Sequence, residues 1–230
     1  MSQTLVGLLS AFPRARLLPG LNELELSAFA LTLPGALRGE IADLFLHASG
    51  LHSEELGRVD FTGRSVTFEF PELAPYAVTL AEANGNTWVV DVNTTGTWGS
   101  VLYFSHDPPT VAIQFSSLRA FLESVVGRRP IVDDASRLAD VVWSRTADAI
   151  SLTDATRSDD PILRSFALSL PTDFQIFDLR AQTTEPRGFS WGRAGPDSIC
   201  RRSGSALIFA VETKPAPRRG WASWFRGRAT

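Results

Sequence analysis

The chain has little of what most catalytic and metal sites are built from. Its 230 residues include one cysteine, Cys200, and three histidines, His47, His52 and His106. A single cysteine excludes an intrachain disulfide and any zinc site made of several cysteines. So few histidines also leave little material for a metal site or a histidine-based triad. We therefore expect no metal and no cofactor.

Long apolar runs and an excess of positive charge are absent as well. No stretch approaches the roughly 18 apolar residues of a membrane helix. The short apolar segment 5–12 has no basic residue ahead of it, unlike a signal peptide. A net charge of −3 and a pI of about 5.7 argue against direct nucleic-acid binding by the whole chain. With a single unpaired cysteine, these features favour a cytoplasmic protein.

Charge is distributed unevenly along the chain. Residues 1–127 contain 6 arginines and 13 acidic residues (−7), whereas residues 128–230 contain 16 basic and 12 acidic residues (+4). The last segment, 214–230, has five basic residues and no acidic one. We expect a first domain over 1–127, then an extension of helices and short strands over 128–213 that packs on it, and a basic aromatic tail.

The first helix is indicated by its cap and by its apolar spacing. Asn22 and Glu25 have the spacing of a capping box. Leu24, Ala28 and Leu31 follow at helical intervals, which predicts a helix after Asn22.

Two further helices flank the middle of the first part. One is predicted to begin at Pro34 and to end at Gly50, and it carries an apolar stripe. The other is predicted to begin at Ser116 or Ser117 and to end at Gly127.

Alternating apolar residues between these helices predict four or five strands. An Asn84-Gly85 turn joins two of them as a hairpin. The predicted strands are Val66–Phe70, Ala77–Glu82, Thr87–Val92, Val101–Phe104 and Val111–Phe115. This order predicts an α+β fold, a mostly antiparallel sheet of four or more strands with helices packed on one side.

The extension has weaker patterns of both kinds. Residues 131–183 are predicted to be mostly helical, and short strands follow. The expected helices lie at Leu138–Trp143 and Ile162–Leu170, and the strands at Phe174–Leu179, Phe189–Trp191 and Leu207–Val211. We expect this part to be a C-terminal α+β extension of the first domain.

Four local features of residues 1–127 occur in a recognisable order. They are Leu33-Pro34 ahead of a helix, a turn leading into an apolar strand with a central acid, a strand ending in His-Asp, and a closing helix after serine. The last three are Asn84–Val92, Val101–Asp107 and Ser116–Leu122. In these features the chain resembles the SUKH superfamily of bacterial immunity proteins and fungal regulators of cell-wall synthesis. It departs from the family, which usually has Trp-Asp-His, at Phe104-Ser105-His106.

The resemblance implies an α+β domain that binds a protein partner and catalyses nothing. The expected function is that of an immunity protein, which neutralises a cognate bacterial toxin by direct stoichiometric binding. The acidic first part favours a basic, nuclease-like toxin. A scaffold or regulator without a toxin partner is the alternative, and the oligomeric state stays open. The candidate partner-binding residues are Asp91, Trp98, His106 and Asp107.

Asp91 lies in an otherwise apolar strand, so it is either on a solvent-exposed face or buried and paired. We expect the exposed face, where it can meet a basic partner. Reversing the charges of Asp91 and Asp107 should then slow partner association at low salt. His106 and Asp107 could be an acid–base pair or half of a metal site. Neighbours in a strand point to opposite faces, however, and Asp107 ahead of Pro108 is typical of a turn.

Cys200 stands beside Arg201 and Arg202, which could lower its pKa and make it a nucleophile. The histidines all lie far upstream, in the first part, so a structural or merely exposed thiol is the favoured interpretation. A hydrolase using His106, Asp107 and Cys200 is kept only as a third class, and we expect no enzyme.

The tail combines arginines with three aromatic residues at i, i+3 and i+4: Trp221, Trp224 and Phe225. Pro215 and Pro217 predict that the ordered fold ends near Lys214. A solvated tail, an anchor on an anionic membrane and a segment docked on the acidic first part are the alternatives. We favour docking on the protein and expect deletion of 214–230 to lower the melting temperature.

Overall fold

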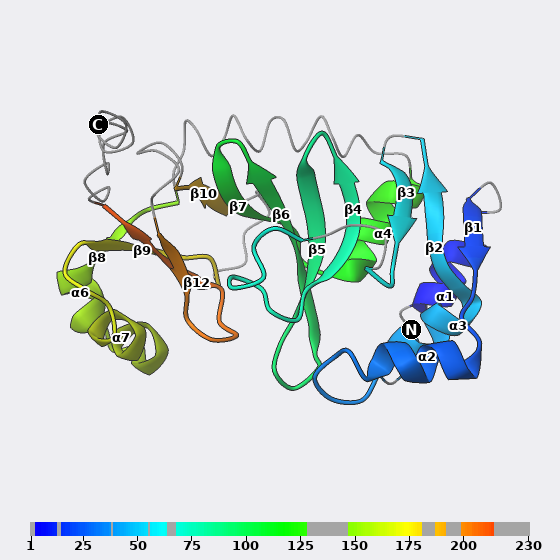
Figure 1. The fold of residues 1–230 in the computed structure, drawn as a ribbon, viewed down its shortest axis with the longest axis horizontal. Coiled ribbons are helices and arrows are strands. Elements are labelled where there is room, and N and C mark those ends of the chain that lie inside the picture. Colours follow the sequence, from blue (N-terminus) through cyan, green and yellow to red (C-terminus); the bar gives the residue numbers. More distant parts are fainter. Residues whose placement is uncertain are drawn as a thin grey trace, which may run out of the picture.

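The structure, a computed structural model, describes residues 3–12, 15–37, 39–54, 56–63, 68–127, 147–180, 187–191 and 199–213. These residues form six helices and three antiparallel sheets (Figure 1), which confirms the predicted α+β class and the predicted antiparallel sheet of four or more strands. The helix expected at Leu138–Trp143 and the tail 214–230 lie outside the described residues.

The first part contributes four helices and seven strands. The helices are α1 (Leu5–Ser10), α2 (Glu23–Ala30), α3 (Glu40–His47) and α4 (Leu118–Val126). The strands are β1 (Arg16–Pro19), β2 (Ala48–Ser53), β3 (Gly57–Asp60), β4 (Val78–Ala83), β5 (Asn86–Val92), β6 (Trp98–His106) and β7 (Pro109–Phe115).

The described residues after 146 contribute two helices and five strands. The helices are α6 (Leu152–Thr156) and α7 (Pro161–Leu168). The strands are β8 (Ile150–Ser151), β9 (Phe174–Asp178), β10 (Arg187–Ser190), β11 (Cys200–Arg202) and β12 (Ile208–Glu212).

The strands form three sheets, with the orders β1-β2-β3, β10-β7-β6-β5-β4 and β11-β12-β9-β8. Strand β10 comes from the C-terminal part but pairs with β7, so that Phe189 lies opposite Val111. The central sheet therefore contains strands from both parts of the chain.

The helix caps that the sequence predicted are present in the structure. Asn22 Oδ1 accepts a hydrogen bond from the Glu25 N–H, and Glu25 Oε2 accepts one from the Asn22 N–H, both at 2.9 Å. Ser117 caps α4 through the N–H of Ala120. Each interaction satisfies a backbone donor that the first helical turn leaves unpaired. The capping box and the Ser117 cap are therefore confirmed.

The β4–β5 hairpin turns at Asn84 and Gly85, which have φ angles of +54° and +77°. Positive φ at both central residues defines the two-residue turn whose twist matches that of the strands. An added Cβ at Gly85 would also lie 2.4 Å from the His106 ring, so the imidazole would have to move.

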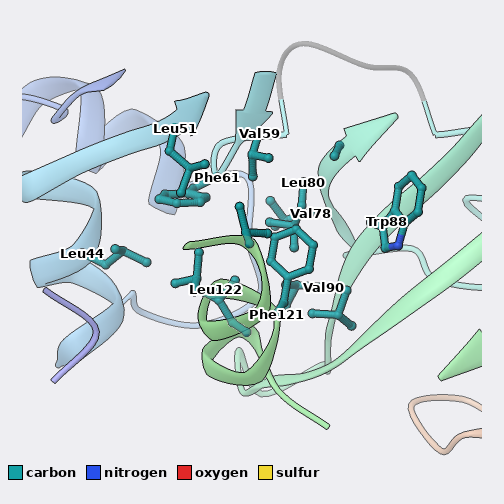
Figure 2. Close-up of a cluster of buried hydrophobic side chains, with 14 of the residues drawn as sticks. Leu44, Leu51, Val59, Phe61, Val78, Leu80, Trp88, Val90, Phe121 and Leu122 are labelled. Carbon is teal, nitrogen blue, oxygen red and sulfur yellow. The ribbon is translucent and has the colours of Figure 1, made fainter. Parts of the chain in front are cut away.

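One face of the central sheet packs against the first hydrophobic core (Figure 2). Trp88 and Val90 of β5 belong to this core, together with Phe121 and Leu122 of α4. Leu44 of α3 and residues of the β1–β2–β3 sheet complete it. The every-second-residue spacing on β5 is the ordinary geometry of a strand with one face in this core.

The opposite face of the central sheet is buried as well, by the C-terminal sheet. Val89 and Phe104 of the central sheet share a second core with Phe177 of β9 and Phe209 of β12. Phe189 of β10 stacks on Phe177, with ring centroids 4.3 Å apart. This second layer explains why strands β5 and β6 are buried on both faces.

Several predicted boundaries are wrong. The second helix begins at Glu40 and ends at His47, and Gly50 lies in β2 instead of ending a helix. An added Cβ at Gly50 would lie 2.2 Å from the Val59 carbonyl oxygen. The absence of a side chain at Gly50 therefore allows β2 and β3 to approach each other closely. Residues 68–70 are not in a strand, although their two phenylalanines pack against the second core.

Arg180 joins α7 to the end of β9 by pairing with Asp160, the N-cap of α7, and with Asp178. The hydrogen bond from Arg180 lowers the pKa of Asp160, with help from the Leu163 N–H. Burial raises the pKa of Asp178, but hydrogen bonds from Arg180 outweigh it and the net pKa is lowered. The folded chain therefore favours the ionised form of both carboxyl groups over the protonated form.

A lowered folded-state pKa contributes stability above the unfolded pKa of about 3.9 and loses it as the pH falls further. Asp160→Asn keeps a good N-cap residue and removes the charge. We expect the variant to be less stable than the parent at pH 6, with a difference that shrinks below about pH 4. Urea unfolding across this range measures it, with Asp159→Asn at the exposed neighbour as control. A difference independent of pH would contradict the ion-pair explanation.

Candidate functional site

The four candidate partner-binding residues do not form one site. Asp91 and Trp98 lie where β5 ends and β6 begins, whereas His106 ends β6 and Asp107 follows it. Trp98 and His106 are the first and last residues of the nine-residue strand β6, which places them roughly 26 Å apart along an extended strand. A single contact patch containing all four residues is therefore not formed.

Asp91 is buried, so the expectation of an exposed face is wrong. The C-terminal sheet covers that face of β5, and only 7 % of Asp91 is exposed. Its carboxylate accepts two hydrogen bonds from Arg202 of β11, from Nη1 at 2.8 Å and from Nη2 at 2.7 Å. A buried carboxylate needs such a partner. Asp91 therefore holds the two sheets together, and reversing its charge would test stability instead of partner capture.

Arg202 is fully engaged by this arrangement. Besides Asp91, its guanidinium donates to the carbonyl oxygens of Leu73, Ser205 and Ala206, each at 2.9 Å. These five hydrogen bonds occupy all five N–H donors of the guanidinium. The residue is a structural anchor.

Trp98 is half-buried and packs edge-on against Phe45, with ring centroids 5.7 Å apart. Its ring belongs to the margin of the first core, beside α3. Its partly open edge leaves Trp98 a partner-contact candidate that also supports the core.

His106 and Asp107 are exposed at the tip of the β6–β7 hairpin. His106 Nδ1 lies 2.9 Å from the carbonyl oxygen of Gly85, in the neighbouring β4–β5 turn. The imidazole therefore links two hairpin tips, and Asp107 stands in the turn that the sequence predicted. Both side chains are accessible to a partner.

Cys200 lies against the second core, and burial raises the pKa of its thiol, with a smaller contribution from the charge of Glu72. A raised pKa keeps the sulfur protonated, which is the opposite of what a nucleophile needs. The neighbouring arginines do not reverse this effect: Arg202 is paired with Asp91, and Arg201 lies over the ring of Phe174. Cys200 is therefore a structural thiol in this fold.

Helix α2, which the helical spacing of Leu24, Ala28 and Leu31 predicted, presents these residues to solvent. Leu24 is 80 % exposed and Leu31 is 88 % exposed. The helix is held instead by Phe29, whose ring centroid lies 4.8 Å from that of Phe45. Two exposed leucines and an alanine on one side of α2 and its C-cap form an apolar surface of the kind that protein partners bind. We call Leu24, Ala28 and Leu31 the α2 stripe.

Acidic side chains flank the α2 stripe. Glu23 and Glu25 lie in the first turn of α2 and are exposed, although Glu25 also closes the capping box. Asp43 of the adjacent helix α3 is exposed too. An apolar stripe with an acidic margin is complementary to a surface that is apolar and basic.

Among the described residues, no group of three or more histidine, cysteine, aspartate or glutamate side chains is placed to hold a metal ion. Among the same residues, no helix is both long enough and apolar enough to cross a membrane.

Comparison with known proteins found no relative: no family model, curated protein or solved structure matches the chain. The resemblance to the SUKH superfamily therefore remains a prediction from local sequence features.

Proposed function

We propose that this protein acts by binding a protein partner through the α2 stripe. The observation that carries the proposal is the exposure of Leu24 and Leu31 on a helix that Phe29 holds against the first core. Burying a leucine side chain in an interface contributes about 1.5–3 kcal/mol. Two such residues on a rigid helix are a strong anchor, and the acidic margin favours a basic partner.

The specific role that we propose is that of an immunity protein in the cytoplasm. The partner is then a bacterial toxin, held in a stoichiometric complex that blocks its active site or its substrate path. The sequence resemblance supports the toxin, and the acidic margin of the α2 stripe supports a basic one. The alternative is a regulator that binds a cellular protein through the same stripe.

Co-expression with the product of the adjacent gene tests the proposal. If that product is a toxin, cells producing both proteins should grow, and the two should purify as a complex of fixed stoichiometry. The alternative predicts a growth phenotype on deletion of the gene in cells that lack the toxin. Toxicity that persists with the protein abundantly present would contradict the immunity role.

Charge reversal at exposed acids should slow capture of a basic partner. We expect Glu23→Lys to lower the association rate constant several-fold at low salt, because steering acts over a Debye length of about 10 Å at 0.1 M. Asp107→Lys tests the hairpin tip in the same way. Stopped-flow mixing at 0.05 M and 0.5 M salt measures the effect. Rate constants unchanged at both salt concentrations would show that charge does not guide association.

A further inference from the structure

A second surface feature lies in the C-terminal part, where α7 faces β11 and the turn that follows it. The two elements border an open groove of about 620 Å³. Figure 1 shows α7 and α2 toward opposite ends of the long axis of the molecule, so this groove is separate from the α2 stripe. The lining residues are Pro161, Ile162, Ser165, Phe166, Ser169, Leu170, Arg201, Arg202, Ser203 and Gly204.

The groove exists because two short helices do not cover a four-stranded sheet. Ala155 of α6 and Leu163 and Phe166 of α7 pack on Ile176 of β9 and Ile208 of β12. Strand β11 lies beyond β12, at the edge of the sheet. Arg201 pairs in register with Ala210, whose side chain belongs to the core beneath the helices, so Arg201 points to the same face.

The lining of the groove is mixed, and its apolar side chains come from the α7 side. Ile162 is 49 % exposed, Phe166 is almost fully buried, and Leu170 is half-buried, whereas serines and arginines supply polar groups. A depression of this size is within the range of ordinary binding pockets.

Among the described residues that line the groove there are two arginines and no acidic residue. Arg202 is neutralised by Asp91, but among the described residues Arg201 contacts only the ring of Phe174, 5.4 Å from its guanidinium carbon. Arg201 is therefore a cation at the rim with its hydrogen-bond donors available, and a carboxylate is its natural ligand.

We propose that this groove binds an extended peptide segment that carries both acidic and apolar side chains. An apolar side chain occupies the space between Ile162 and Phe166, and a carboxylate pairs with Arg201. An extended segment fits because β11 is the last strand of its sheet within the described residues, and edge strands accept added strands. Charge disfavours the chain's own segment 214–230 as the occupant, since it has five basic residues and no acid.

A pair of labelled peptides tests this site. The probe is a fluorescein-labelled hexapeptide of alternating leucine and glutamate, and its match has lysine in place of glutamate. By fluorescence anisotropy we expect the acidic peptide to bind the full-length protein and the basic one not to bind. Arg201→Ala should weaken binding about tenfold, the effect of losing one charge-assisted contact. Ile162→Glu should weaken it as well, by placing a like charge in the apolar wall.

Two controls keep the result specific. Arg157→Ala removes an exposed arginine outside the groove and should leave binding unchanged. Leu24→Glu on the α2 stripe should also leave peptide binding unchanged, so this site and the proposed function can fail independently. Absence of binding, equal binding of both peptides, or equal effects of Arg201→Ala and Arg157→Ala would each overturn the proposal.

Discussion

Replacing Arg202 by alanine is expected to lower the free energy of unfolding by about 3–5 kcal/mol, the usual effect of removing one partner from a buried ion pair. The substitution leaves the carboxylate of Asp91 buried without its two hydrogen bonds. It also removes the donors to the carbonyl oxygens of Leu73, Ser205 and Ala206. Urea unfolding followed by tryptophan fluorescence measures the effect.

The adjacent residue supplies a matched control. Arg201→Ala deletes the same side chain one position earlier, at an exposed site, and should change stability by no more than about 0.5 kcal/mol. The double variant Asp91→Leu with Arg202→Met should recover much of the loss, because a buried ion pair can often be replaced by apolar residues of similar volume. Equal effects of Arg202→Ala and Arg201→Ala would show that the pair does not hold the two sheets together.

The second large effect is expected on the α2 stripe. Leu24→Glu combined with Leu31→Glu should weaken partner binding at least 100-fold, because each leucine contributes about 1.5–3 kcal/mol when buried. Both side chains are exposed in the free protein, so its stability should change little. Surface plasmon resonance against the partner measures affinity, and the melting temperature reports the fold.

Leu168→Glu is the control for this pair. Leu168 is a leucine on α7 that is 70 % exposed, so its substitution makes the same kind of change, one leucine to one glutamate, at a similarly open site elsewhere. It should leave partner affinity unchanged. If the Leu168 variant and the α2 double variant lose affinity equally, the effect comes from general surface charge and not from the α2 stripe.

Local sequence signals predicted the elements whose determinants lie within a few residues. The Asn22–Glu25 capping box, the Asn84-Gly85 turn and the Ser117 cap all formed as expected. Helix α1 and the β1–β2–β3 sheet were not predicted. Helix α1 has six residues, and the strands of that sheet have four to six, too few for a clear period.

The site residues were harder to predict because their surroundings are set by distant segments. Asp91 was expected on an open face, but its partner Arg202 is 111 residues away in sequence. The α2 stripe has a helical period, yet a period does not say which side of the helix faces solvent. Leu26 and Phe29 pack on the first core, and the more regular series Leu24, Ala28 and Leu31 points outward.

Hydrogen–deuterium exchange of the protein, alone and in complex with the product of the adjacent gene, tests the central claim most directly. If the partner binds the α2 stripe, amides of residues 23–31 should gain protection in the complex, while those of the α7–β11 groove exchange as before. The Leu24→Glu, Leu31→Glu variant should show no such gain. A stable complex in which residues 23–31 exchange as they do in the free protein would contradict the account.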